Sequence, residues 1–226
     1  KLFETKKLRI MSDIKEKEPL FSAKIAKTFL GPLSLNNPVT VQILGICSSL
    51  AVTVQLKPAL IMALSVTIVT GFSNLIISLM RNTIPSRIRI IVQLVVIATL
   101  VIIVDQMLKA YVYDVSKKLS VFVGLIITNC ILMGRLEAYA MGNKPWPSFV
   151  DGIANGVGYG IILIVLGFIR ELLGSGKIMG FNVIPDSLYQ LGYENNGLMI
   201  LPPMALITIG VIIWVHRSWK KSLIEK

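Results

Sequence analysis

Six long apolar stretches cross this 226-residue chain, and they restrict its fold more than any other feature. An α-helix needs about 20 apolar residues, at about 1.5 Å of rise each, to cross a bilayer. Four of the stretches meet or approach that length, and the third can extend to about Leu108 by accepting Asp105. We therefore predict an all-α integral membrane protein with six transmembrane helices. The uncharged runs are Pro38–Leu56, Pro58–Met80, Ile90–Val104, Leu119–Gly134, Gly152–Ile169 and Asn195–Val215.

The composition and the placement of charge agree with a membrane protein. Hydrophobic residues make up 54% of the chain and charged residues 15%, which is too little charge to cover a soluble domain. With six spans and a cytoplasmic N-terminus, 17 Lys and Arg residues lie on the cytoplasmic side and 6 on the other. This is the positive-inside bias, and it predicts that both termini are cytoplasmic. The net charge of +11 orients the protein and does not indicate nucleic-acid binding.

Two short matches indicate that the spans form two related sets of three. Cys47 lies in the first apolar stretch and Cys130 in the fourth, each near the middle. The sequence Asn-Thr-Ile-Pro at 82–85 follows the second stretch, and Asn-Val-Ile-Pro at 182–185 follows the fifth. A longer loop carrying residues 145–147 accounts for the unequal spacing of the two matches.

The repeat predicts the domain organisation. Residues 1–36 form a cytoplasmic N-terminal segment, 37–110 the first three-helix repeat, and 111–226 the second. Because each repeat has an odd number of spans, the second runs through the membrane inverted relative to the first. Inverted repeats bring equivalent elements together near the midplane, often as broken helices. We expect the first and fourth spans to be half-helices that carry the cysteines.

Three glycines in the fifth stretch share one helical face. Gly152, Gly156 and Gly160 are spaced by four residues, which lets a neighbouring helix backbone approach closely. We expect this face to pack within the subunit rather than at a subunit interface.

The two cysteines are the strongest candidates for chemistry, and the residues alone leave three interpretations open. A buried cysteine often acts as a small hydrophobe without reactivity. A disulfide is the second alternative, although a thiol facing a reducing cytoplasm is a poor candidate for one. The third is metal ligation, since Cys47 and Cys130 occupy matched positions of a repeat. A [2Fe–2S] cluster usually takes four thiolates, so two more would come from a homologous partner.

A cluster inside the membrane needs its negative charge compensated. Backbone N–H groups at broken helix ends and the polar side chains beside each cysteine are the candidates: Ser48, Ser49, Thr128 and Asn129. Ser and Thr hydroxyls in membrane helices more often bond back to their own backbone, which weakens this expectation.

Acidic residues near the apolar stretches are candidates for a cation path. Asp105 lies at the far end of the third stretch and Asp151 beside the start of the fifth. Ionisable groups at membrane depth are rare and often serve ion passage, but they also occur as headgroup anchors or in pairs. For Arg170 and Glu171, at the end of the fifth stretch, we expect boundary anchoring or pairing.

Longer motifs around these residues resemble a known family. The segment at 37–53, with Leu-Gly-Ile-Cys-Ser-Ser-Leu-Ala-Val-Thr at its end, is similar to the first cysteine motif of the D-type subunits in the Nqr D/E and Rnf A/E membrane-subunit family. The segment 121–138, with Ile-Ile-Thr-Asn-Cys, is similar to the second, and 168–176 also matches. The resemblance covers about residues 30 to 216 and is strongest to D-type subunits of sodium-pumping NADH:quinone reductases.

That resemblance implies a six-subunit respiratory pump in the bacterial inner membrane, in which this subunit is not catalytic alone. It implies that Cys47 and Cys130 supply two ligands of a [2Fe–2S] cluster shared with a homologous E subunit. Electrons from NADH would pass through the FAD-bearing F subunit and on to FMN on the C subunit. The B subunit, with riboflavin, would pass them to ubiquinone, and the A subunit completes the complex. Sodium export would be coupled to this transfer, with Asp105 and Asp151 on the cation path.

Two alternatives remain beside that expectation. The related E subunit of an Rnf ferredoxin:NAD oxidoreductase shares the second motif, although Ser48 after the first cysteine favours the Nqr type. A small-solute secondary transporter with incidental cysteines is the other, and it predicts that Cys47→Ser leaves function intact.

Overall fold

The protein is described here by a computed structural model that is helical over most of its described length. It describes residues 29–32, 36–85, 87–111, 124–179, 181–182 and 197–219. The α-helices are α3 (Ile46–Val52), α4 (Leu56–Met80), α5 (Arg89–Tyr111), α7 (Cys130–Arg135), α8 (Pro145–Ser175) and α10 (Pro202–Trp219). A π-helix η1 (Leu136–Ala140) continues α7, and a 3₁₀-helix η2 (Gly197–Ile200) precedes α10. Strands β1 (Lys177–Ile178) and β2 (Phe181–Asn182) form a small antiparallel pair after α8.

Three helices in the described ranges are long and apolar enough to cross a membrane. They are α4, α5 over Arg89–Met107, and α8, and they correspond to the second, third and fifth predicted stretches. The first stretch instead contains the short helix α3, the fourth overlaps the short helix α7, and the sixth overlaps α10. The division into two inverted three-helix repeats stays a prediction, since residues 183–185 of the second motif lie outside the described ranges.

Helix α8 is longer than its apolar stretch indicated. It has 31 residues and begins at Pro145, so the segment predicted as a loop, 145–147, forms its first turn. A proline in the first helical turn loses no hydrogen bond, because that N–H has no partner within the helix. Gly176 ends the helix in a left-handed conformation, and its N–H donates to the carbonyl of Leu172.

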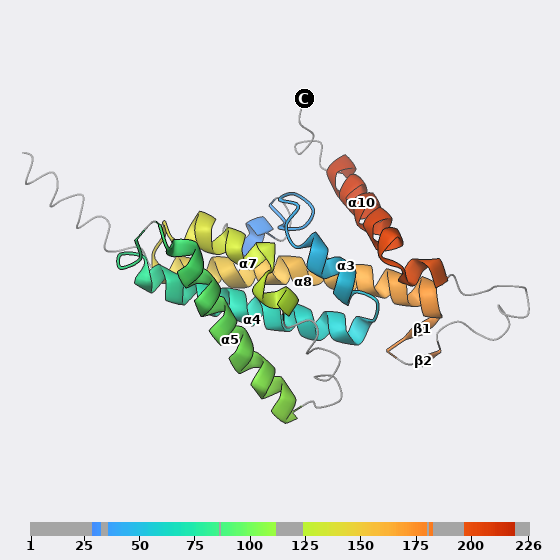
Figure 1. Ribbon diagram of the computed structural model, residues 1–226. Helices are drawn as coiled ribbons and strands as arrows, with labels where there is room; N and C mark the ends of the chain where they lie inside the picture. The colour runs from blue at the N-terminus through green and yellow to red at the C-terminus, as the bar shows by residue number, and fades with distance from the viewer. Residues whose placement is uncertain are drawn as a thin grey trace, which may run out of the picture.

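Helices α4 and α8 run antiparallel and form the centre of the molecule (Figure 1). The glycine face of α8 lies directly against α4. A Cβ on Gly156 would lie 2.6 Å from Cα of Thr67, and one on Gly152 would lie 2.7 Å from the carbonyl oxygen of Thr70. A Cβ on Gly160 would meet Ala63 at 3.0 Å. The expectation that this glycine face packs within the subunit is therefore confirmed.

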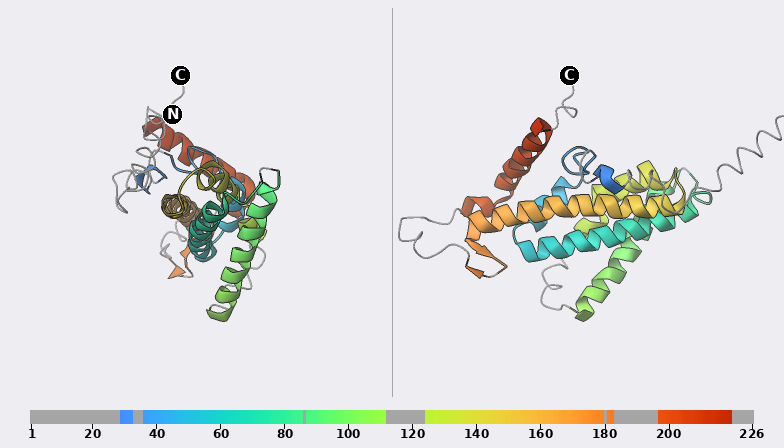
Figure 2. Two further views of the ribbon diagram at one scale, coloured as in Figure 1. Left: turned by 90° about the vertical axis from the view of Figure 1, so that its left-hand side faces the viewer. Right: turned by 180° about the vertical axis from the view of Figure 1, so that it is seen from behind.

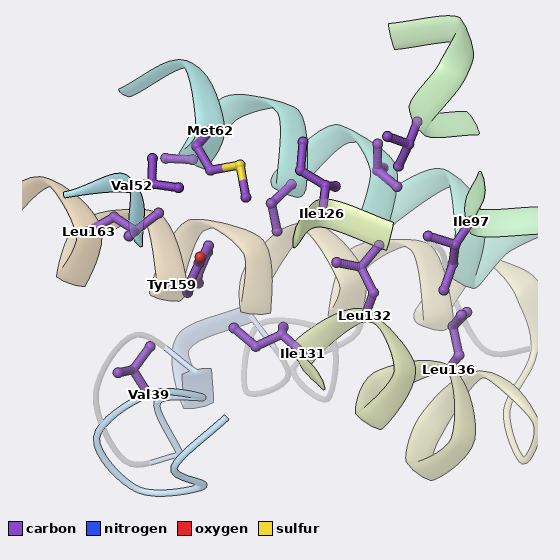
Figure 3. Close-up of a cluster of buried hydrophobic side chains, with 14 of the residues drawn as sticks. Val39, Val52, Met62, Ile97, Ile126, Ile131, Leu132, Leu136, Tyr159 and Leu163 are labelled. Carbon is purple, nitrogen blue, oxygen red and sulfur yellow. The ribbon is translucent and has the colours of Figure 1, made fainter. Parts of the chain in front are cut away.

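A buried apolar cluster fills the space between this helix pair and the short helices. Figure 3 shows its members from α4, α5, α7, η1 and α8 pointing toward one another, with Ile131, Leu132 and Tyr159 among them. In contrast, α5 and α10 diverge from the central pair in different directions (Figure 2). Many of their apolar side chains are exposed in the single chain, including Ile91 on α5 and Trp214 on α10, as expected of surfaces that face lipid or other subunits.

Candidate functional site

Both cysteines lie at the beginning of short helices. Cys47 is the second residue of α3, and Cys130 is the first residue of α7. Both are free thiols, and both are exposed on the surface of this chain. Neither is the inert buried cysteine that was one of the three interpretations of the sequence.

The turn before Cys47 needs glycine at position 45. Gly45 caps α3 with φ at 77°, a left-handed conformation that L side chains rarely adopt. A Cβ there would also lie 2.6 Å from Cδ1 of Ile131 and 3.1 Å from Cε2 of Tyr159. Ile43, two residues earlier, has a φ of 57°, which is unusual for a β-branched residue. The chain is therefore sharply turned immediately before the Cys47 helix, and it presses against the Cys130 helix.

The residue before Cys130 caps α7 and reaches the other cysteine segment. The Asn129 side chain accepts a hydrogen bond from the Ile131 N–H at 3.2 Å, as an N-cap residue does. Its Nδ2 donates to Oγ of Ser48 at 3.2 Å. Gly134 of α7 also lies close to Leu44, since a Cβ there would be 3.2 Å from Cδ1 of that leucine. The segments that carry the two cysteines are therefore side by side.

Ser48 is the centre of a buried polar network. Its Oγ lies 3.0 Å from the Gly45 carbonyl oxygen and 2.7 Å from the Tyr159 hydroxyl. Ser48 and Tyr159 are 0% exposed, and Asn129 is 1% exposed. The network joins α3, α7 and α8, and it includes the residue after Cys47 and the residue before Cys130.

The other hydroxyls expected to compensate a cluster donate to backbone carbonyls instead. Ser49 donates to the carbonyl of Ile46 at 2.7 Å, and Thr128 donates to that of Gly124 at 3.0 Å. This is the common behaviour of Ser and Thr in membrane helices. The hydrogen of each hydroxyl is used in a bond to a nearby backbone carbonyl. The structure therefore does not support a role for Ser49 or Thr128 in compensating the negative charge of a cluster.

Arg170 is bound to the end of the Cys47 helix, and its hydrogen bonds go to oxygens other than those of Glu171, while its position at the membrane boundary stays a prediction. The residue is 1% exposed. Its guanidinium donates to the Leu50 carbonyl at 3.1 Å and to Oγ1 of Thr53 at 2.7 Å. It also donates to the carbonyls of Met199 and Ile200 in η2. A cation at the C-terminus of a helix satisfies carbonyls that have no partner within that helix.

Glu171, the next residue of α8, binds the beginning of α4. Its carboxylate accepts from the Leu56 N–H at 2.6 Å, at the first residue of α4, and from the Met179 N–H at 2.9 Å. An acidic group at a helix N-terminus satisfies an N–H without an intrahelical partner. Two consecutive residues of α8 therefore bind the two helix ends that flank the break between α3 and α4. Arg170 binds the end of α3, and Glu171 binds the beginning of α4.

Asp151 forms an ion pair with the end of the Cys130 helix. Arg135 donates to its carboxylate from Nε at 3.0 Å and from Nη2 at 2.5 Å. Asn155, one turn further along α8, donates to the same carboxylate at 3.1 Å. The aspartate side chain is 3% exposed, and the arginine guanidinium also lies over the ring of Tyr139. This candidate for the cation path is therefore held by a two-point ion pair.

Asp105 lies on α5. Its carboxylate pairs with Lys109 one turn later at 2.6 Å, and that lysine is 43% exposed. Screening by solvent or headgroups leaves such a pair weaker than the Arg135–Asp151 pair.

The donors available to a metal are consistent with a shared site. The sequence contains two cysteines in total. Among the residues placed by the structure, no group of three or more His, Cys, Asp or Glu side chains is positioned to hold a metal ion. Two exposed thiols on neighbouring helices are suitable soft ligands for iron, but they are half of a four-thiolate set. A four-thiolate cluster at this place would need ligands beyond the two cysteines of this chain.

The fold and the two surface thiols define an integral membrane protein built around a glycine-packed helix pair. A family model described as "Rnf-Nqr subunit, membrane protein" matches residues 25–213. The chain belongs to this family.

Three curated relatives named as the D subunit of a Na(+)-translocating NADH-quinone reductase match over 90–99% of their own length. The chain is 60% identical over 201 residues to the relative of that name from Pseudomonas paraeruginosa, which covers 89% of this chain and 90% of the relative. It is 57% identical to the relative from Yersinia enterocolitica, covering 91% of this chain and 98% of the relative. The relative from a Shewanella species is 54% identical over 95% of this chain and 99% of its own length.

Proposed function

We propose that this chain is the D-type subunit of a Na⁺-translocating NADH:quinone reductase. The names and the high identity of its relatives support this assignment over an Rnf E subunit or a small-solute transporter. The family model covers Rnf and Nqr subunits together and so supports the class without separating the two. In this proposal the chain works in the bacterial inner membrane with both termini in the cytoplasm.

In the proposed complex, Cys47 and Cys130 are ligands of a [2Fe–2S] cluster shared with a homologous E-type subunit. The observation that carries this is the position of the two thiols, which are exposed at the starts of short helices whose flanking residues touch. When bound, such a cluster accepts and donates single electrons. The chain itself contributes the ligands, a buried polar network behind them, and an apolar core that keeps water away.

The remaining cofactors belong to other subunits in this proposal. The F subunit binds NADH and FAD, the C subunit binds FMN, and the B subunit, with riboflavin, serves quinone reduction. The A and E subunits complete the set of partners. The D-type chain holds its cysteines between these centres, inside the hydrocarbon region.

Asp105 and Asp151 are the proposed residues of the cation path within this chain. Each carboxylate is already paired, with Lys109 and Arg135 respectively. For either to bind a passing Na⁺, its ion pair has to loosen in one state of the cycle. Transport would then require two conformations of the chain, one with the ion pairs closed and one with them loosened. Na⁺ can favour the second conformation only if it binds that conformation more tightly than the first.

The proposal is tested by purifying the complex and measuring iron content and the EPR spectrum of the reduced cluster. We expect a [2Fe–2S] signal in the wild-type complex, and its loss in Cys47→Ser and Cys130→Ser complexes that still assemble. The chain purified without its E-type partner should give no such signal. An equal signal from the solitary chain would refute shared ligation, and quinone reductase activity retained in either Cys variant would refute the ligand assignment.

A further inference from the structure

Tyr159 lies behind both cysteine segments. It is part of α8, is 0% exposed, and places its hydroxyl 2.7 Å from Oγ of Ser48. Its ring edge lies against Gly45, where an added Cβ would be 3.1 Å away. Figure 3 shows its side chain projecting from α8 in the neighbourhood of Ile131, the residue after Cys130.

Counting hydrogens indicates which groups donate in this network. A serine hydroxyl carries one hydrogen and can accept two more bonds. The Ser48 hydrogen is directed to the Gly45 carbonyl, and the Asn129 amide donates to the Ser48 oxygen. The Tyr159 hydroxyl then donates to that same oxygen. The hydroxyl oxygen of Ser48, the residue after Cys47, thus accepts hydrogen bonds from Asn129, the residue before Cys130, and from Tyr159 of α8.

The short helices need this external support. Helix α3 has 7 residues and α7 has 6, and helices of that length do not hold their shape or position by themselves. Helix α8 is long and is fixed against α4 through its glycine face. A fully paired polar network in a low-dielectric interior is strong and directional, because its members have no water to exchange with.

We propose that Tyr159 is a positioning residue that holds the thiols of Cys47 and Cys130 in the relative arrangement needed for metal ligation. This inference rests on the proposed function, because it takes the two cysteines to be cluster ligands. Tyr159 acts through Ser48 and Asn129 and does not touch the metal. Its phenol ring lies beside Gly45 at the start of the Cys47 helix, and its hydroxyl holds Ser48, to which Asn129 at the start of the Cys130 helix is also bonded.

The test uses the intact purified complex and the variant Tyr159→Phe, which keeps the ring and removes the hydroxyl. The matched control is Tyr139→Phe, a tyrosine on η1 whose ring contacts Arg135, away from this network. Two quantities are measured: the chelator concentration that removes half of the iron, and the EPR line shape of the reduced cluster. Residues that orient metal ligands without touching the metal typically contribute about 10- to 100-fold to the affinity for the metal.

We expect half of the iron to be lost from Tyr159→Phe at a chelator concentration at least about tenfold lower than from wild type. The EPR line shape should change as well, while Tyr139→Phe matches wild type in both measurements. Wild-type behaviour of Tyr159→Phe in both measurements would overturn the inference, as would an equal effect of the control.

A second variant covers the case in which Tyr159→Phe does not assemble. Ser48→Ala removes the shared oxygen, and its control is Ser73→Ala, whose hydroxyl donates to the Val69 carbonyl within α4. Loss of iron retention in an assembled Ser48→Ala complex, with the control intact, supports the inference. Failure of both network variants to assemble, with both controls intact, would assign the network to folding alone and overturn it.

These outcomes are distinguishable from failure of the proposed function. If the wild-type complex lacks an iron–sulfur signal, or Cys47→Ser retains it, the ligand assignment fails. If the wild-type signal depends on both cysteines but not on Tyr159 or Ser48, only the positioning role fails.

Discussion

Arg170 donates a hydrogen bond from Nη1 to Oγ1 of Thr53 at 2.7 Å, across 117 positions of sequence. Thr53 is the residue at which the Cys47 helix ends, and its own hydroxyl donates to the carbonyl of Ser49. The arginine therefore fixes the end of α3 to the C-terminal part of α8. The placement of one cysteine helix thus depends on a residue at the far end of α8.

Replacing Arg170 by Met should lower the thermal stability of the purified complex. Several carbonyls would lose their donor, and each buried acceptor left unpaired costs about 1–3 kcal/mol. Arg170→Lys keeps the positive charge but has one ammonium group in place of the guanidinium. Its thermal stability should therefore lie between that of the Met variant and that of wild type. Thermal unfolding in detergent measures the effect, and a Met variant as stable as wild type would show that these bonds contribute little.

Gly156→Ala should destabilise the central helix pair. The new Cβ would lie 2.6 Å from backbone Cα of Thr67, so the helices would have to separate. Overpacking of this kind typically costs about 1–3 kcal/mol. Gly210→Ala on α10 is the matched control, since its Cβ would meet nothing within 4 Å in this chain. Equal melting temperatures for the two variants would contradict the close approach.

Variants of the Arg135–Asp151 ion pair can separate a structural role of the pair from a role in Na⁺ transport. Either single change, Arg135→Gln or Asp151→Asn, leaves one buried partner alone and should cost about 3–5 kcal/mol. The double variant should regain a large part of that stability. If Asp151 is on the cation path, Na⁺ transport into proteoliposomes stays impaired in the stable double variant. Recovery of transport together with stability would show that the pair is structural alone.

Exposure of the two thiols predicts how they react with labels. In the chain purified without its partner, Cys47 and Cys130 should both react with a membrane-permeant maleimide, because both thiols are exposed on the surface of the chain. In the intact complex, a shared cluster should protect both. Mass spectrometry of the labelled chain measures the difference, and rapid labelling of either cysteine in the iron-loaded complex would contradict ligation at that residue.

The long helices and the glycine interface could be predicted from the sequence because both follow from local patterns. Apolar runs of about 20 residues located α4 and α8, and small residues spaced by four identified the face of α8 that meets α4. Matched cysteines pointed to two related segments, and the Asn129–Ser48 bond brings their flanking residues together. Shared metal ligation by Cys47 and Cys130 stays a prediction.

The partners of single polar residues could not be predicted, because they depend on contacts between distant parts of the chain. Arg170 and Glu171 are neighbours in sequence, which suggested a pair or an anchor, but each satisfies a different helix end. Tyr159 lies one turn after Asn155 in an apolar run, and only its distance to Ser48 reveals its role. The sequence favours a loop at Pro145, but proline also begins helices, and no local pattern separates these two uses.

The regular geometry of α8 has a mechanical consequence for the Cys47 helix. Tyr159 supports the beginning of α3 through Ser48, and Arg170 supports its end, eleven residues further along α8. Eleven residues are close to three turns, so the two side chains emerge in nearly the same direction. Inserting one alanine between them would rotate Arg170 by about 100° around the axis of α8. The Cys47 helix would then keep its first attachment and lose its second, and would be free to pivot about Ser48.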